Sequence, residues 1–228
     1  MSETLREWLD RELKDFEPVW KSFRGKQQRM YYIWMVAAVV GMVALGFGVG
    51  YDLAYVLRVH LLIGVGIAAF IWLCVLLANL ANTMKNARKQ FEKALSALSP
   101  SDQEAFAQQN FGRVDFLNTT EDSFPARLLV GPDFWLYFRG ICHIYRVSDM
   151  EELWAEEEKT QVHYNIGNAR VRQKVGIGVS LIVNYRKDTA SARERSDKVY
   201  LANWKQFQTV RELIGRYCPK VKTLWKEK

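Results

Sequence analysis

Cysteine is scarce in this chain of 228 residues, which has only Cys74, Cys142 and Cys218 and no C-x-x-C pair. Small folds held together by disulfides need a denser set of cysteines, and structural zinc sites need clustered thiol or imidazole ligands. The three cysteines therefore indicate neither a disulfide framework nor a zinc site. They fit a reducing compartment for the soluble part of the protein.

One long stretch of the chain lacks charged residues, and a second lacks almost all polar residues. Residues 31–49 contain no charged residue, and residues 61–80 contain Asn79 as their only strongly polar side chain. A helix rises about 1.5 Å per residue, so roughly 20 apolar residues cross a hydrocarbon layer of about 30 Å. The two runs predict two transmembrane helices, because a helical hairpin buried in a soluble protein has a polar stripe or shorter helices. The first run is too long for a signal peptide, and no small-residue cleavage site follows it.

Acidic residues are rare beside these runs, whereas basic residues are frequent there. The turn between the runs, residues 50–60, carries only Asp52 and Arg58 as charged residues. Basic residues collect on the cytoplasmic side of a membrane, so we expect a two-pass protein of the inner or plasma membrane with both termini in the cytoplasm. The same cations attract anionic lipid headgroups by about 1 kcal/mol each when they lie at the surface. They are Lys21, Arg24, Lys26 and Arg29 before the first run, and Lys85, Arg88 and Lys89 after the second.

The two runs contain no Asp, Glu or Lys, but they contain several small residues. Gly46, Gly64 and Gly66 allow close approach between helices, which favours packing of the hairpin on itself and, second, homo-oligomerisation. Two helices without ionisable groups cannot enclose a polar path, so a channel or transporter is disfavoured for the monomer. An accessory subunit of a larger membrane complex, for transport or envelope synthesis, stays an alternative.

The pattern divides the chain into four segments. Residues 1–29 form an amphipathic helix whose mixed charge favours packing on protein over binding to anionic lipid. Residues 30–84 form the transmembrane hairpin, with spans at about 31–49 and 61–80, and residues 85–123 form a helical linker. Residues 124–228 form a β domain that ends in a helix.

Alternation of apolar and polar residues, together with short apolar runs bounded by turn residues, predicts the strands of this last segment. Gly131-Pro132-Asp133 makes a hairpin turn between strands at 127–130 and 134–138. Further strands are expected at 141–147, 150–155, 159–164, 175–185 and 198–202, which gives six or seven strands in all. Glu156–Glu158 is expected as a corner between the strands at 150–155 and 159–164. Asn203 caps a final amphipathic helix. The expected fold is α+β: a small barrel or bent sandwich closed by the C-terminal helix.

The order of these elements resembles a family of membrane-anchored bacterial proteins with a pleckstrin-homology-like (PH-like) domain. The resemblance rests on two spans followed by LLVGPDFWLYF, IYRVSDMEELWA and a terminal WKQFQTVRELIGRYC helix, and it covers roughly residues 30–217. It implies a scaffold or binding module without assigned activity. Phosphoinositide binding in related domains uses basic residues in the first turn, and Gly131–Asp133 has none.

The candidate chemical groups favour binding over catalysis. Cys142 and His143 are neighbours on an expected strand, so they lie on opposite faces and cannot easily share a metal. An acidic group, Glu151, Glu152 and Glu156–Glu158, would suit a cation or a hydrolase, but consecutive acids more often protect a strand edge.

Arg170, Arg172 and Lys174 alternate along one face and offer contacts for anionic lipid or a protein partner. No aromatic residues are interleaved with them, which argues against nucleic acid. We expect a non-enzymatic scaffold without cofactor or metal, held in the lipid bilayer, that presents its PH-like domain to a protein partner or to the inner membrane face. A membrane-bound hydrolase is the less favoured alternative.

Overall fold

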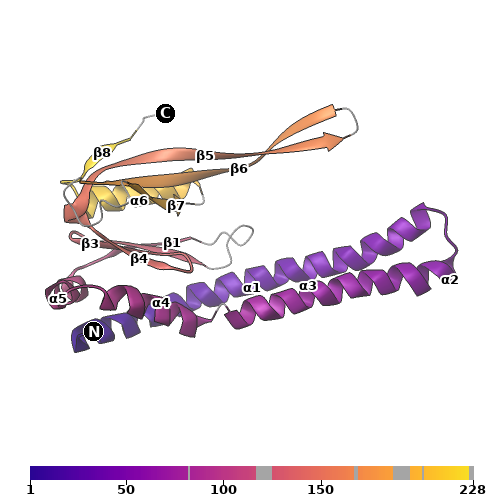
Figure 1. The fold of residues 1–228 in the computed structure, drawn as a ribbon, viewed down its shortest axis with the longest axis horizontal. Coiled ribbons are helices and arrows are strands. Elements are labelled where there is room, and N and C mark those ends of the chain that lie inside the picture. Colours follow the sequence, from indigo (N-terminus) through magenta and orange to yellow (C-terminus); the bar gives the residue numbers. More distant parts are fainter. Residues whose placement is uncertain (82, 117–124, 167–168, 187–195, 202, 226–228) are drawn as a thin grey trace. The chain divides into compact units, whose positions relative to one another are not determined.

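The computed structural model describes residues 1–81, 83–116, 125–166, 169–186, 196–201 and 203–225, with side chains excluded at 78–81 and 158–177. The chain forms two compact units (Figure 1). The first contains Met1–Glu12 and the described residues of 90–116 and 125–225, and the second contains the described residues of 13–89.

The second unit is built from two long helices. Helix α1 runs from Glu3 to Gly48 without interruption, although Pro18 lies inside it and removes one backbone hydrogen bond. Gly50 has a positive φ of 88° where the chain turns, and Asp52 caps the next helix by accepting a hydrogen bond from the Tyr55 amide at 2.9 Å. The short helix α2 (Leu53–Tyr55) and a π-helical turn (Val56–His60) lead into α3 (Leu61–Ala81).

The predicted N-terminal helix and first span are thus one helix, 46 residues long. The Ser2 hydroxyl caps its start by accepting a hydrogen bond from the Leu5 amide at 3.3 Å. After α3, helix α4 spans Met84–Ser96 and helix α5 spans Pro100–Gln108. Ser99 caps α5 and Pro100 opens it, an arrangement in which the missing proline N–H costs nothing.

In the first unit, the early residues of α1 pack against α5. The Trp8 ring meets Phe106 edge-on at 4.9 Å, and Phe106 also contacts Phe134 at 5.7 Å. The Ser2 amide donates to the Gln103 side chain at 3.0 Å. The prediction that the amphipathic N-terminal segment packs on protein is confirmed for these residues.

One sheet of this unit is an antiparallel meander of four strands in the order β1-β2-β3-β4. Strands β2 and β3 are buried at every residue, whereas β1 alternates. Their bounds are β1 Gly112–Phe116, β2 Ala126–Val130, β3 Phe134–Phe138 and β4 Cys142–Arg146. The predicted hairpin about Gly131–Asp133 is confirmed by the β2–β3 pairing.

The other sheet has the order β7-β6-β5-β8. Strands β5 (Met150–Ile166) and β6 (Ala169–Tyr185) pair along their whole length as one long antiparallel ribbon. Strand β7 (Ser196–Leu201) borders β6, and the short β8 (Lys222–Leu224) runs parallel to β5. The corner predicted at Glu156–Glu158 is wrong, since β5 continues through it.

A single apolar core joins both sheets to helix α6 (Trp204–Tyr217). Trp135 of β3, Leu181 of β6 and Val210 of α6 are all fully buried in it. The Asn203 side chain caps α6 by accepting from the Gln206 amide at 3.0 Å, as predicted. The expected α+β class is confirmed, but neither sheet closes into a barrel. The fold is a pair of four-stranded sheets with a helix in their common core.

Candidate functional site

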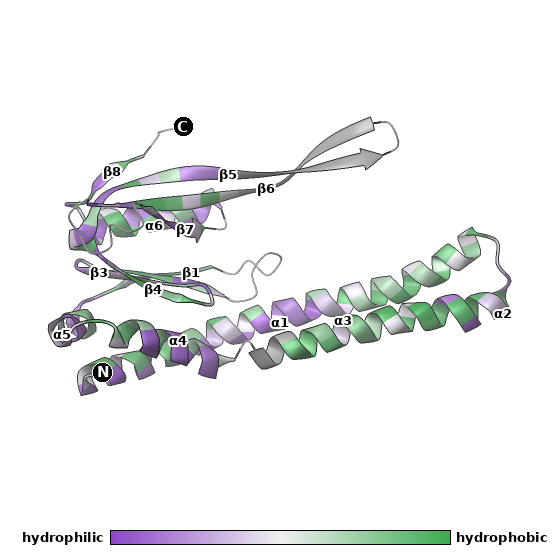
Figure 2. Ribbon diagram, viewed as in Figure 1, coloured by the Kyte–Doolittle hydropathy of each residue, from purple (hydrophilic) through white to green (hydrophobic). Residues whose placement is uncertain are grey.

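The most exposed apolar surface of the described chain lies on helices α1 and α3 of the second unit. Figure 2 shows hydrophobic residues along α3 and the later part of α1, whereas the early part of α1 is mixed. Both helices are long and apolar enough to cross a membrane. Only 6% of the most apolar 18-residue stretch is buried in Glu3–Gly48, and only 11% of the corresponding stretch in Leu53–Leu77. The exposed side chains include Ile33, Trp34, Val36, Leu62 and Phe70, each more than 60% accessible. A monomer in water rarely exposes an apolar patch of more than a few hundred Å².

Glycine allows the two helices to approach closely. A Cβ atom added at Gly64 would lie 2.9 Å from the Val39 Cα atom, and one added at Gly46 would lie 2.9 Å from the His60 Cγ atom. These contacts pair the end of α1 with the start of α3, so the helices run antiparallel as a hairpin. The predicted role of small residues in hairpin packing is confirmed at Gly46 and Gly64. Gly66, in contrast, has open space around it.

The turn of the hairpin holds an aromatic cluster that the sequence does not indicate. His60 is 7% exposed, and its ring lies 5.3 Å from Tyr51 and 5.8 Å from Tyr55. The His60 Nδ1 atom has no hydrogen-bond partner among the described residues. The π-helical turn places His60 against Gly46.

The predicted basic residues beside the apolar runs belong to the second unit. Lys21, Lys26, Arg29, Lys85 and Lys89 are exposed, and Arg24 and Arg88 are half-buried. Since the helices run antiparallel, both groups of cations lie at the same end of the hairpin, opposite the turn at residues 50–55. Lys21 pairs with Glu17 at 2.8 Å, and its hydrogen bond and charge lower the pKa of that exposed carboxyl.

The other predicted basic group lies on the outer half of the β5–β6 ribbon. Register places Arg170, Arg172 and Lys174 opposite Asn165, His163 and Gln161. These positions share one face of the ribbon, because paired residues of adjacent strands lie on the same side. The side chains of these residues lie outside the described part of the chain.

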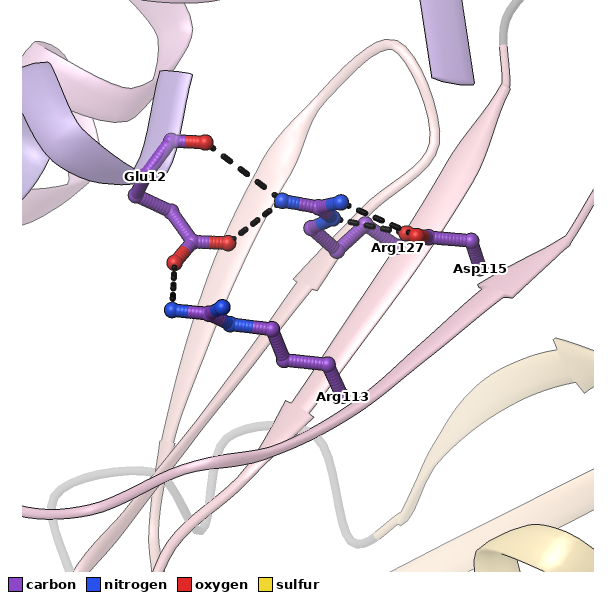
Figure 3. Close-up of polar contacts among 4 residues, drawn as sticks. All are labelled: Glu12, Arg113, Asp115 and Arg127. Atoms are coloured by element: carbon purple, nitrogen blue, oxygen red, sulfur yellow. Dashed lines mark hydrogen bonds and ion pairs between the residues drawn. The ribbon is translucent and has the colours of Figure 1, made fainter. Parts of the chain in front are cut away.

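A buried charge cluster, missed by the sequence analysis, ties the first turns of α1 to the meander sheet (Figure 3). The Glu12 carboxylate accepts from Arg127 Nη1 at 2.6 Å, and its other oxygen lies 3.0 Å from Arg113 Nη2 in an ion pair without hydrogen-bond geometry. Arg127 also donates to Asp115 through Nε at 2.6 Å and Nη2 at 2.9 Å. Glu12 and Arg127 are 1% and 2% exposed.

The electrostatics of this cluster favour its charged form. Burial alone lowers the pKa of Arg127, but the hydrogen bonds and charges of Asp115 and Glu12 outweigh it, so the pKa is raised. A bidentate Arg–carboxylate pair with a second carboxylate on the remaining nitrogen satisfies most of the guanidinium donors. The cluster is therefore a structural clamp between the start of helix α1 and the meander sheet. A charged residue in the otherwise apolar strand ARLLV was the only signal of it in the sequence.

In the described part of the chain, the thiols and acids show no arrangement typical of catalysis. Cys142 is buried and His143 exposed on the same strand, which confirms their opposite orientation. Burial raises the pKa of the Cys142 and Cys218 thiols, so both stay protonated and unreactive at neutral pH. Among the described residues no group of three or more metal-binding side chains occurs. Glu152 pairs with Lys222 at 3.1 Å and Glu156 with Lys198 at 3.3 Å.

Comparison with known proteins adds no relative: no family model, curated protein or solved structure matches this chain.

Proposed function

We propose that this protein is a non-enzymatic binding module anchored in a membrane by the α1–α3 hairpin. The main evidence is the broad apolar surface on both helices. Contact of this surface with water is unfavourable, whereas contact with the hydrocarbon of a bilayer is not. The two helices meet through glycine, a mode of packing that suits a lipid environment, where close backbone approach replaces the hydrophobic effect.

The direction of insertion follows from the charged groups at the hairpin ends. Exposed lysines and arginines gather at the end that holds Lys21 and Lys85, whereas the turn carries Asp52 and Arg58. The positive-inside tendency therefore orients the turn outward and both termini toward the cytoplasm. In this orientation the cations also contact the anionic inner leaflet.

The first unit is the binding part of this proposal. Its continuous apolar core, its buried thiols and the ion pairs of Glu152 and Glu156 support a scaffold role over a hydrolase. The two-sheet arrangement with a C-terminal helix is compatible with the PH-like resemblance, which favours a protein partner. Lipid-headgroup binding in the β2–β3 turn has no support, since residues 131–133 contain no cation.

Cysteine labelling of the full chain in the cells that express it tests this anchor. Leu53→Cys places a thiol in the turn at a 60% exposed position, and Lys85→Cys places one at the other end of the hairpin. Both are made with Cys74→Ala, and buried Cys142 and Cys218 give little background. We expect a membrane-impermeant maleimide to label residue 53 in intact cells and residue 85 only after permeabilisation.

The same cells provide the control for insertion itself. After extraction of the membranes at alkaline pH, we expect the protein in the pellet. Release into the supernatant contradicts the anchor, and labelling of residue 85 alone in intact cells contradicts the orientation.

A further inference from the structure

A broad hollow in the first unit lies where strand β5 passes α6 and the end of β8. Its volume is about 1410 Å³, above the roughly 300–1,000 Å³ of ordinary ligand pockets, and it is open to solvent. Beyond Trp154, strand β5 has no partner on the β8 side among the described residues, because β8 ends at Leu224. The hollow therefore follows from the shortness of β8.

Aromatic rings form one part of its lining. Phe207 is buried, and the indoles of Trp204 and Trp225 meet its ring edge-on at 5.2 Å and 5.3 Å. Both indoles and Trp154 are half-buried. Partly exposed indole rings around a hollow offer π-faces to a ligand.

Carboxylates from one strand form another part. Glu152, Glu156 and Glu157 line the hollow, and Arg211 is the one cation among its described lining residues. Three carboxylates against one guanidinium give the lining a formal charge of −2, although the whole chain carries +7. The hollow thus has the opposite sign to the protein that holds it.

The carboxylates are held in place by groups at the rim. The Trp204 Nε1 atom donates to Glu157 at 3.2 Å, which fixes both the indole and the acid. Lys222 and Lys198 pair with Glu152 and Glu156, but these lysines are 65% and 45% exposed and do not line the hollow. Ion pairs exposed to this extent are weak and exchange readily with another cation.

From this lining we infer that the hollow binds an organic cation, a guanidinium or alkylammonium group seated between the indole rings and the β5 carboxylates. Indole faces attract such cations, and the carboxylates supply the opposite charge. An anion is repelled by the net charge of the lining, and an apolar ligand leaves three acids unused. The cation is either a free small molecule or the side chain of an arginine or lysine in a partner's peptide.

This inference deepens the binding role proposed above and rests on it, but it is tested separately from the membrane anchor. Labelling of the hairpin reports insertion only, and cation binding is measured on the purified full chain in detergent micelles. A negative result in the labelling experiment therefore does not affect the interpretation of the cation-binding experiment, and the reverse also holds.

Calorimetric titration with three probes separates the sources. Methylguanidinium represents a free cation, a glycine pentapeptide with a central arginine represents a peptide side chain, and the same peptide with neutral citrulline is the matched control. We expect binding of the arginine peptide and none of the citrulline peptide. Methylguanidinium binding as tight as the peptide assigns the site to a small molecule, and binding at least tenfold weaker assigns it to a peptide. Equal binding of the arginine and citrulline peptides overturns the proposal.

Substitutions of the lining residues are expected to change the affinity for a cation in opposite directions. Glu152→Gln with Glu156→Gln weakens cation binding about tenfold, and Trp225→Leu weakens it about threefold. Arg211→Gln removes the opposing charge and tightens binding about threefold, a gain that misfolding cannot produce. Glu104→Gln removes an exposed acid of α5 that does not line the hollow, and it leaves affinity unchanged. Unchanged or weaker binding in Arg211→Gln overturns the proposal.

Discussion

At the scale of single residues, the clamp formed by Glu12, Arg113, Asp115 and Arg127 depends mainly on its two buried members. Arg127 serves two carboxylates from the interior, whereas Arg113 is 47% exposed and reaches only one oxygen of Glu12. Removing one partner of a buried pair leaves an uncompensated charge, but an exposed pair contributes little. The four residues are therefore unequal in their contribution to stability.

We predict that Arg127→Met lowers the free energy of unfolding by about 3–5 kcal/mol, because it leaves buried Glu12 without its main partner. Arg113→Met, the matched control at the rim, lowers it by no more than about 1 kcal/mol. Urea unfolding of the full chain in detergent, followed by tryptophan fluorescence, measures both. Adding Glu12→Leu to Arg127→Met restores part of the loss, since no buried charge then stands alone. Equal losses in the two single variants contradict this ranking.

The sequence indicates that Arg127 needs a charged partner, but it does not indicate which residue this partner is. A charge inside ARLLV needs a partner, yet Glu12 lies 115 residues away and Asp115 lies on a strand, β1, that the pattern did not predict. Partners this distant are set by tertiary packing, which a single sequence does not encode in its local periodicity. The caps at Ser2 and Asn203 were predictable because each bonds a backbone amide only three residues away.

At the scale of elements, two glycines allow the helices of the hairpin to approach, and one faces a side chain whereas the other faces backbone. Gly46 faces the side chain of His60, which can move, whereas Gly64 faces the backbone of Val39, which cannot move without separating the helices. Gly66 lies on the same helix with open space around it. This difference provides a matched pair of substitutions.

Gly64→Ala is expected to destabilise the hairpin by about 1–3 kcal/mol through overpacking. Gly66→Ala is expected to be neutral or to stabilise it by up to about 1 kcal/mol, because alanine favours helix and nothing opposes the added methyl group. The loss of helix as the SDS fraction rises in mixed micelles, measured by circular dichroism, compares the two. A Gly64→Ala hairpin as resistant as Gly66→Ala shows that the contact with Val39 is not formed.

Apolar length made the two long helices predictable, and short apolar or aromatic runs bounded by turn residues made β2, β3 and β4 predictable. The pattern failed where tertiary contacts outweigh local signals. Strand β5 passes through Glu156 and Glu157 because both residues pair with β6, opposite Ser180 and Val179. Strand β8 has three residues and exists only through its pairing with β5, so no periodicity could reveal it. Closure of a barrel likewise depends on strand pairings between sheets.

At the scale of the whole molecule, buried protonated groups make the folded state sensitive to alkali. Burial raises the pKa of Cys142, and burial with the nearby Asp197 raises the pKa of Tyr145. In the unfolded chain these groups lose their protons near pH 9 and pH 10. Their contribution is therefore fully present below about pH 9 and is lost as the pH rises further.

We predict that the free energy of unfolding of the sheet-bearing unit falls above pH 9, with each group adding a slope of about 1.4 kcal/mol per pH unit once its unfolded form is ionised. Tyr145→Phe removes one such contribution above pH 10, so its slope is shallower there. Urea unfolding between pH 7 and pH 11 tests this, with stability at pH 7 as the baseline of each protein. A Tyr145→Phe slope as steep as that of the parent contradicts the assignment to Tyr145.

The continuity of α1 from Glu3 to Gly48 has a consequence for how this gene can change in length. One inserted residue turns all later side chains by about 100° around the helix axis and shifts them by 1.5 Å. Insertions or deletions between buried Phe23 and Val39, which contacts Gly64, are therefore tolerated best in steps of seven, which nearly restore the phase. Related genes, when aligned, should show this spacing in their indels.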